Sequence, residues 1–173
     1  MTEYAMNPTD IFINGPRSKR YSRLREIFYS DDRVSNRRLT MYDFQFLLAL
    51  VGLREEHDGE IPGKSENTDF TTIGRVPYSR NENEFDARFG LVTILTSLDE
   101  EYDTVLNHKA FLKNSHGEKY TELPNVSVFY KSLFAGTDKL YDELAEDDIS
   151  DDESIFDALY NIINDGYLDL SEK

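Results

Sequence analysis

The stretch LTMYDFQFLLALVGL, residues 39–53, is the most apolar run of the chain. Thr40 is a favourable N-cap residue, and Asp43 follows it at the spacing of a capping box. Gly52 supplies an exit at the other end. The stretch therefore predicts a helix from Thr40 to Leu53. Because this helix is apolar on nearly all sides, we expect it to be buried at the centre of the protein.

Amphipathic patterns predict further helices on both sides of this one. They cover residues 18–29, 84–97, a segment after the capping box at 97–100, 124–144 with a break at Gly136, and 154–164. Tyr102 and Phe156 belong to the faces that we expect to point inward. For residues 91–98, which are rich in β-branched side chains, a strand is the competing interpretation. The predicted fold class is mainly α, a compact multi-helix domain around the helix at 40–53.

The connecting segments complete a single domain of 173 residues. Residues 1–16 form an N-terminal arm, in which residues 11–13 are expected to dock on the body or to add a short strand. Residues 55–81 form a long polar loop with a small β-hairpin at 68–79. Residues 146–153 form an acidic linker to the last helix. Because long loops are uncommon in compact domains, the loop at 55–81 is expected to be mobile or to contact a partner.

The composition excludes several classes of protein. The chain has no cysteine, which rules out a disulfide framework and thiol catalysis and fits a reducing compartment. The 11 Phe and 11 Tyr residues are too many for a disordered chain and predict an aromatic core. No signal peptide is expected from the N-terminus, and the longest apolar run falls short of the roughly 20 residues that span a bilayer. We therefore expect a cytoplasmic protein.

The charge is large, negative and unevenly distributed. The net charge is −15, from 34 acidic and 19 basic residues. Eight basic and three acidic residues lie between positions 17 and 38, whereas thirteen acidic and two basic residues lie between 138 and 173. Either the two ends pair with each other in the fold, or they address different partners. The acidic surface serves solubility, or it repels nucleic acid and attracts a basic groove.

No catalytic, cofactor or metal motif is present in the sequence. His57, His108 and His116 lack metal-ligand spacing, and there is no cysteine to assist them. The segment at 59–65 has three residues between its glycines where a phosphate-binding loop needs four. The acidic run at 147–153 lacks the alternating ligands and central glycine of a calcium loop. We therefore expect no enzyme, no cofactor and no metal.

The order of elements resembles small accessory proteins encoded beside bacterial DNA phosphorothioation (sulfur-modification) and related antiviral defence genes. The resemblance lies in the apolar helix at 41–52 with its polar loop, in residues 85–98, and in residues 129–140 with the Ala135-Gly136 break. It covers about half of the chain, and the acidic region at 146–173 is an addition. The resemblance implies an accessory, protein-binding role near a DNA-handling machine, and it implies no site residues.

The sequence thus predicts a non-enzymatic acidic subunit or regulator that binds another protein, a nucleic-acid-binding or defence-complex component. Neither direct DNA binding nor membrane binding is expected. The alternatives are a DNA-mimic inhibitor, of the anti-restriction or anti-CRISPR type, that occupies the basic groove of a target enzyme, and a small enzyme of unknown reaction. The candidate partner-binding residues are Arg20, Arg23, Lys64, Arg75, Asp147, Asp148, Asp151, Asp152, Glu153 and Asp157.

Overall fold

The computed structural model describes residues 10–29, 39–55, 61–73, 82–111, 124–145 and 152–167. The elements are, in chain order, β1 (Ile11–Asn14), α1 (Gly15–Phe28), α2 (Met41–Val51), β2 (Phe70–Ile73), α3 (Glu82–Thr96), α4 (Tyr102–His108), α5 (Pro124–Ala145) and α6 (Asp152–Tyr167). The protein is mainly helical, as the sequence predicts, with a small antiparallel sheet.

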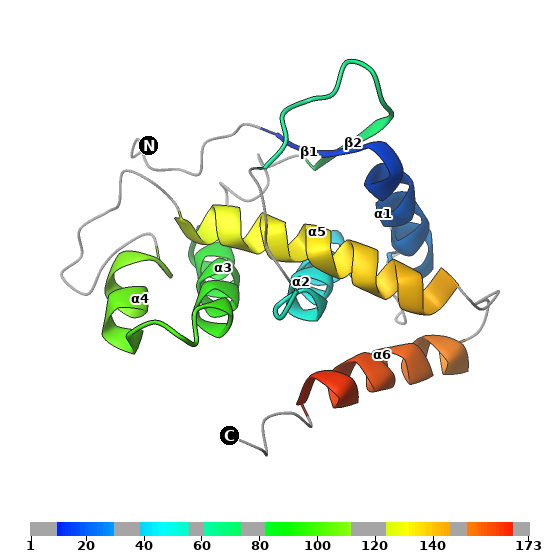
Figure 1. Ribbon diagram of the computed structural model, residues 1–173. Helices are drawn as coiled ribbons and strands as arrows, with labels where there is room; N and C mark the ends of the chain where they lie inside the picture. The colour runs from blue at the N-terminus through cyan, green and yellow to red at the C-terminus, as the bar shows by residue number, and fades with distance from the viewer. Residues whose placement is uncertain are drawn as a thin grey trace.

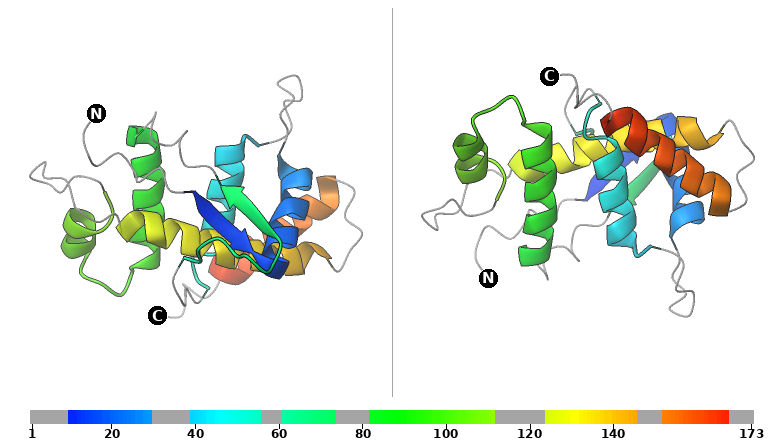
Figure 2. Two further views of the ribbon diagram at one scale, coloured as in Figure 1. Left: turned by 90° about the horizontal axis from the view of Figure 1, so that it is seen from above. Right: turned by 90° about the horizontal axis from the view of Figure 1, so that it is seen from below.

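The 22-residue helix α5 organises this architecture. It runs across the middle of the molecule and packs against α1, α2, α3 and α6, with the sheet on one side and α6 on the other (Figure 1). Seen from above and below, α2 and α3 both cross α5 at steep angles (Figure 2). The core therefore forms where these four helices pack against α5, and the contact between α2 and α5 is the largest of the four.

The expected helix around residues 40–53 is confirmed as α2, and so is its cap. The backbone N–H of Asp43 donates to the Thr40 hydroxyl at 3.2 Å, and that hydroxyl donates to the Asp43 carboxylate at 2.6 Å. Phe44, Leu48 and Ala49 of this helix are fully buried. The other apolar side chains of α2 are only partly buried, because the helix packs one face against α5.

The break expected at Gly136 is wrong, since α5 continues without interruption to Ala145. The glycine serves a close helix crossing instead. A Cβ built at Gly136 would overlap the Leu48 carbonyl oxygen of α2 and would lie 2.8 Å from the Gly52 nitrogen. A Cβ built at Gly52 would overlap the Ser132 carbonyl oxygen of α5 in the same way. The two glycines thus allow the backbones of α2 and α5 to touch.

The strand within the 68–79 loop is confirmed as β2, and its partner in the described part of the chain is β1. β2 pairs antiparallel with β1, in a register that places Ile11 opposite Ile73. Ile11, Ile13 and Ile73 are all buried, so this pairing brings apolar side chains from the two strands to the core. The segment at 11–13 therefore adds a short strand, one of its two expected roles, and residues 74–81 lie outside the described part of the chain.

The strand interpretation of residues 91–98 is wrong, because α3 is helical through Thr96. Threonine is unfavourable in helices partly because its hydroxyl competes for backbone hydrogen bonds. Here the Thr93 hydroxyl donates to the Phe89 carbonyl at 2.9 Å, and the Thr96 hydroxyl donates to the Val92 carbonyl at 3.0 Å. The side chains thereby bond within the helix instead of opening it.

Tyr21 is a buried polar group at the junction of α1 and α2. Its side chain is 2% exposed, and its ring lies 5.4 Å from that of Phe44. The Gln45 amide donates to the Tyr21 hydroxyl at 3.2 Å, and this hydroxyl donates to the Met41 sulfur at 3.7 Å. Burial raises the pKa of Tyr21 to about 12, although the Gln45 hydrogen bond and the charge of Arg25 act in the opposite direction.

This pKa predicts a loss of stability at high pH. The unfolded chain releases the Tyr21 proton near pH 10, whereas the folded protein keeps it up to about pH 12. The contribution is fully present below pH 10 and is lost as pH rises, by an amount on the order of 2–3 kcal/mol of unfolding free energy. We expect the unfolding free energy of the native chain, measured with urea, to fall relative to that of Tyr21→Phe as pH increases from 9 to 12, because the variant lacks the titrating hydroxyl. A difference independent of pH would contradict this assignment.

Candidate functional site

The first candidate residue, Arg20, belongs to an internal ion-pair network between α1 and α5. Its guanidinium lies 3.0 Å from the Asp138 carboxylate and 3.2 Å from Asp142. The Arg17 Nε donates to Asp138 at 2.7 Å. Both arginines also lie over aromatic rings of α5. The Arg17 guanidinium is 5.5 Å from the centre of the Phe134 ring, and the Arg20 guanidinium is 5.2 Å from the centre of the Tyr141 ring.

This network bears on the uneven charge of the sequence. Arg17 and Arg20 come from the basic segment, and Asp138 and Asp142 come from the acidic one. The two ends of the chain therefore pair with each other here, which is one of the two expected arrangements. The ionic and ring contacts of Arg20 all lie on α5, and its role in binding a partner stays a prediction.

The remaining candidate residues whose side chains are described lie on three different parts of the chain: α1, the segment before β2, and α6. Arg23 is exposed and pairs with Glu26 on α1 at 3.2 Å. The Lys64 ammonium lies 4.8 Å from the centre of the Phe70 ring. Asp157 is exposed on α6, whose first turn contains Asp152 and Glu153. Four candidates lie outside the described residues: Arg75, Asp147, Asp148 and Asp151. The side chains of the other two, Asp152 and Glu153, are not described.

A surface that sequence reasoning missed lies between α3 and α4. Leu98 is 70% exposed and Tyr102 is 60% exposed, although Tyr102 was expected to point inward. Tyr102 is the first residue of α4, where only Val105 is buried. Because α4 is only seven residues long and contacts the core through Val105, its other side chains, Tyr102 among them, are not fully covered by the rest of the protein. The four acidic residues around Tyr102 were the sequence signal of its exposure.

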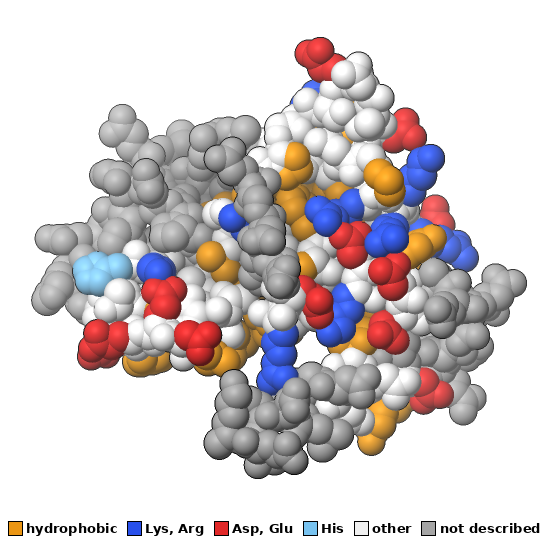
Figure 3. Space-filling view, in the orientation of Figure 1, with side chains coloured by type: hydrophobic (Ala, Val, Ile, Leu, Met, Phe, Trp, Pro, Cys, Tyr) orange, Lys and Arg blue, Asp and Glu red, His pale blue; other side chains and the backbone are white. Residues whose placement is uncertain are grey.

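We call residues 98–103 the α4 corner. Its carboxylates are Asp99, Glu100, Glu101 and Asp103, all exposed. Glu100 pairs with Lys109. Within the described part of the chain, no basic side chain pairs with the other three. Figure 3 shows hydrophobic and acidic side chains side by side along the edge of the molecule formed by α3 and α4.

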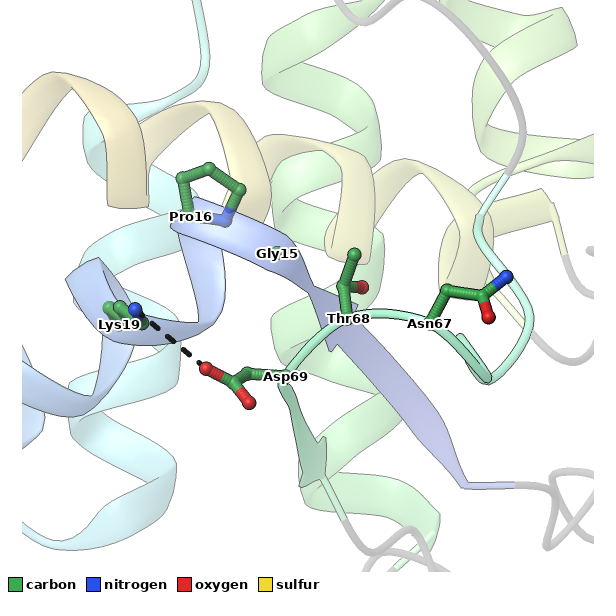
Figure 4. A pocket seen from close by; sticks show the side chains of 6 residues that line it. All are labelled: Gly15, Pro16, Lys19, Asn67, Thr68 and Asp69. Atoms are coloured by element: carbon green, nitrogen blue, oxygen red, sulfur yellow. Dashed lines mark ion pairs between the residues drawn. The ribbon is translucent and has the colours of Figure 1, made fainter.

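An open hollow of about 390 Å³ lies between the start of α1 and the segment before β2 (Figure 4). Lys19 and Asp69 face each other across it at 3.7 Å, and both are largely exposed. The Gly15 N–H at the start of α1 already donates to the Asp69 carbonyl at 2.8 Å. A paired lysine and a carboxylate at the helix start leave little positive potential, so the hollow does not favour an anion.

The described residues contain no group of three or more histidine, cysteine, aspartate or glutamate side chains placed to hold a metal ion. Within the same ranges, no helix is long and apolar enough to cross a membrane. Scans against protein-family models, curated proteins and solved structures found no match to the chain.

Proposed function

We propose that this protein is a non-catalytic acidic domain that binds another protein through the α4 corner. The observation that carries the proposal is the exposure of Leu98 and Tyr102, at 70% and 60%, among exposed carboxylates of which Asp99, Glu101 and Asp103 have no basic partner in the described residues. Large exposed apolar side chains within a polar rim are typical of protein interfaces, and tyrosine is a frequent hot-spot residue. The corner therefore fits a partner with an apolar depression surrounded by basic residues.

The charge narrows the class of partner. With a net charge of −15, the chain repels nucleic acid and is drawn towards basic proteins. Strongly basic surfaces are characteristic of proteins that bind nucleic acid. We therefore propose a subunit or regulator of a nucleic-acid-handling complex, of the defence type that the sequence resemblance implies.

The apolar centre of the α4 corner favours this role over that of a DNA mimic. A mimic of the phosphate backbone needs carboxylates, and it gains nothing from an exposed Leu98. Several carboxylates elsewhere are also used inside the fold, such as Asp138 and Asp142 with Arg20 and Glu55 with Lys139 at 2.7 Å.

The test compares two double variants that leave the net charge unchanged. Leu98→Ser/Tyr102→Ser removes the apolar centre of the α4 corner, and Lys19→Ser/Asp69→Ser alters an exposed pair elsewhere. We expect affinity purification from the source cell to retain a basic protein, and the affinity of the purified pair to fall at least about tenfold for the first variant only. Equal affinity for both variants would contradict the proposal. A partner that DNA displaces, with no effect of the first variant, would favour the mimic.

A further inference from the structure

We propose that the outer face of α6 around Tyr160 binds an arginine side chain of a basic partner protein. The inference rests on the proposed function and gives the partner a chemical signature. It concerns a second contact, because α6 and the α4 corner lie at different ends of the molecule (Figure 1).

The protein contains an occupied example of such an arginine site. The segment DKLYD, residues 138–142 of α5, holds Arg20 of α1. The guanidinium lies 5.2 Å from the Tyr141 ring centre, and its two terminal nitrogens lie 3.0 Å from Asp138 and 3.2 Å from Asp142. A planar guanidinium is suited to this arrangement, because it can stack on a ring while its edge donates to carboxylates.

The segment DALYN, residues 157–161 of α6, repeats the arrangement along the sequence. Asp157 precedes Tyr160 by three positions, as Asp138 precedes Tyr141. Asn161 follows the tyrosine and offers an amide oxygen where the first segment has a carboxylate. Both segments are helical, so their equivalent residues have the same relative directions on the helix surface.

The two segments also turn the same face inward. Leu140 of α5 is fully buried, and Leu159 of α6, its equivalent, is partly buried against the core. On α6 the tyrosine face is left open to solvent. Tyr160 is 55% exposed, and Phe156, one turn earlier, is 66% exposed. This exposure corrects the expectation that Phe156 points inward.

The open face presents an aromatic platform beside a negative charge. The rings of Phe156 and Tyr160 are stacked, with centres 6.3 Å apart and planes inclined by 22°. Asp157 is exposed, and it has no basic partner among the described residues. Figure 3 shows hydrophobic and acidic side chains next to each other on the surface over α6. The described residues supply no arginine to complete the site, and we assign that arginine to another molecule.

Charge identifies that molecule as a basic protein segment. A second copy of this chain would carry its own charge of −15 to the contact, and nucleic acid would bring phosphates against Asp157. An arginine-bearing segment brings the opposite charge. Arginine is favoured over lysine because the compact ammonium cannot stack on the rings and bind two acceptors along one edge.

The test uses the full-length protein and two synthetic nine-residue peptides, one with three arginines in a glycine and serine background and one with lysines at the same positions. Backbone amide NMR titrations at low salt give the affinity and the location of binding. We expect the arginine peptide to bind about threefold to tenfold more tightly than the lysine peptide and to shift α6 amides. Tyr160→Leu, which keeps apolar area but removes the ring face, should abolish the preference.

The matched charge variants are Asp157→Asn and Asp99→Asn, which change the net charge equally at the two surfaces. Only Asp157→Asn should weaken binding of the arginine peptide. Equal affinity for both peptides, a Tyr160→Leu variant that keeps the preference, shifts confined to the α4 corner, or self-association of the chain that Tyr160→Leu abolishes would each overturn the inference. Failure here would leave the proposed function standing if the natural partner still depends on Leu98 and Tyr102.

Discussion

Replacing Gly136 with alanine should lower the free energy of unfolding by at least ~3 kcal/mol. The added Cβ would overlap the Leu48 carbonyl oxygen, and it would lie 2.8 Å from the nitrogen of Gly52. Both obstacles are backbone atoms of α2, so no side-chain rotation relieves them. The two helices would have to separate along their whole contact, which is the largest in the core. The sign is diagnostic, since alanine in place of glycine within an ordinary helix stabilises by about 1 kcal/mol.

Urea unfolding followed by far-UV circular dichroism measures this effect, and Gly63→Ala is the matched control. A Cβ at Gly63 would meet no atom within 4 Å, so its effect should stay within about 0.5 kcal/mol. A Gly136→Ala protein that does not fold at all is the extreme form of the expected result. If the two alanine variants were equally stable, the backbone contact between α2 and α5 would be wrong.

The sequence was informative wherever a local pattern decides the structure. The cap of α2 could be predicted because Thr40 and Asp43 bond to each other across three residues. The strand at β2 was likewise indicated by its own composition. The partner of that strand could not be predicted, because β1 lies more than fifty residues earlier and the pairing depends on which apolar side chains reach the core together.

Gly136 shows why a correct local signal can be assigned the wrong cause. Glycine weakens a helix, and a break was therefore the natural interpretation. The decisive fact is tertiary: another backbone occupies the space of the missing side chain. No property of the surrounding sequence distinguishes these two uses of glycine.

The candidate site was the least predictable part of the protein. Arg20 was a candidate for binding a partner because positive charge on a helix is usually exposed. Its guanidinium instead forms ion pairs with Asp138 and Asp142 of α5. Tyr102 was expected to be buried because the amphipathic pattern placed it on the inward face of its helix. Its exposure follows from the small size of α4 and from where that helix sits, both of which depend on the assembled core.

Phe44→Ala should be the second most damaging substitution, with a loss of ~3–5 kcal/mol of unfolding free energy. The side chain is fully buried, and its ring lies 5.4 Å from Tyr21 and 6.2 Å from Phe28. Truncation would remove its apolar contacts and leave a cavity between α1 and α2. The hydrophobic packing around this cavity cannot collapse freely, because α2 is fixed against α5 by the glycine contact at Gly52.

Phe156→Ala is the control that separates burial from residue type. This phenylalanine also lies on a helix, but it is 66% exposed and contacts Tyr160 alone among the described aromatic rings. Its removal should change the unfolding free energy by less than about 1 kcal/mol. Urea unfolding of the two variants side by side, with unchanged slopes, provides the measurement. A Phe156→Ala protein as unstable as Phe44→Ala would mean that the outer face of α6 is packed in the fold, and the arginine site around Tyr160 would then have no open surface to occupy.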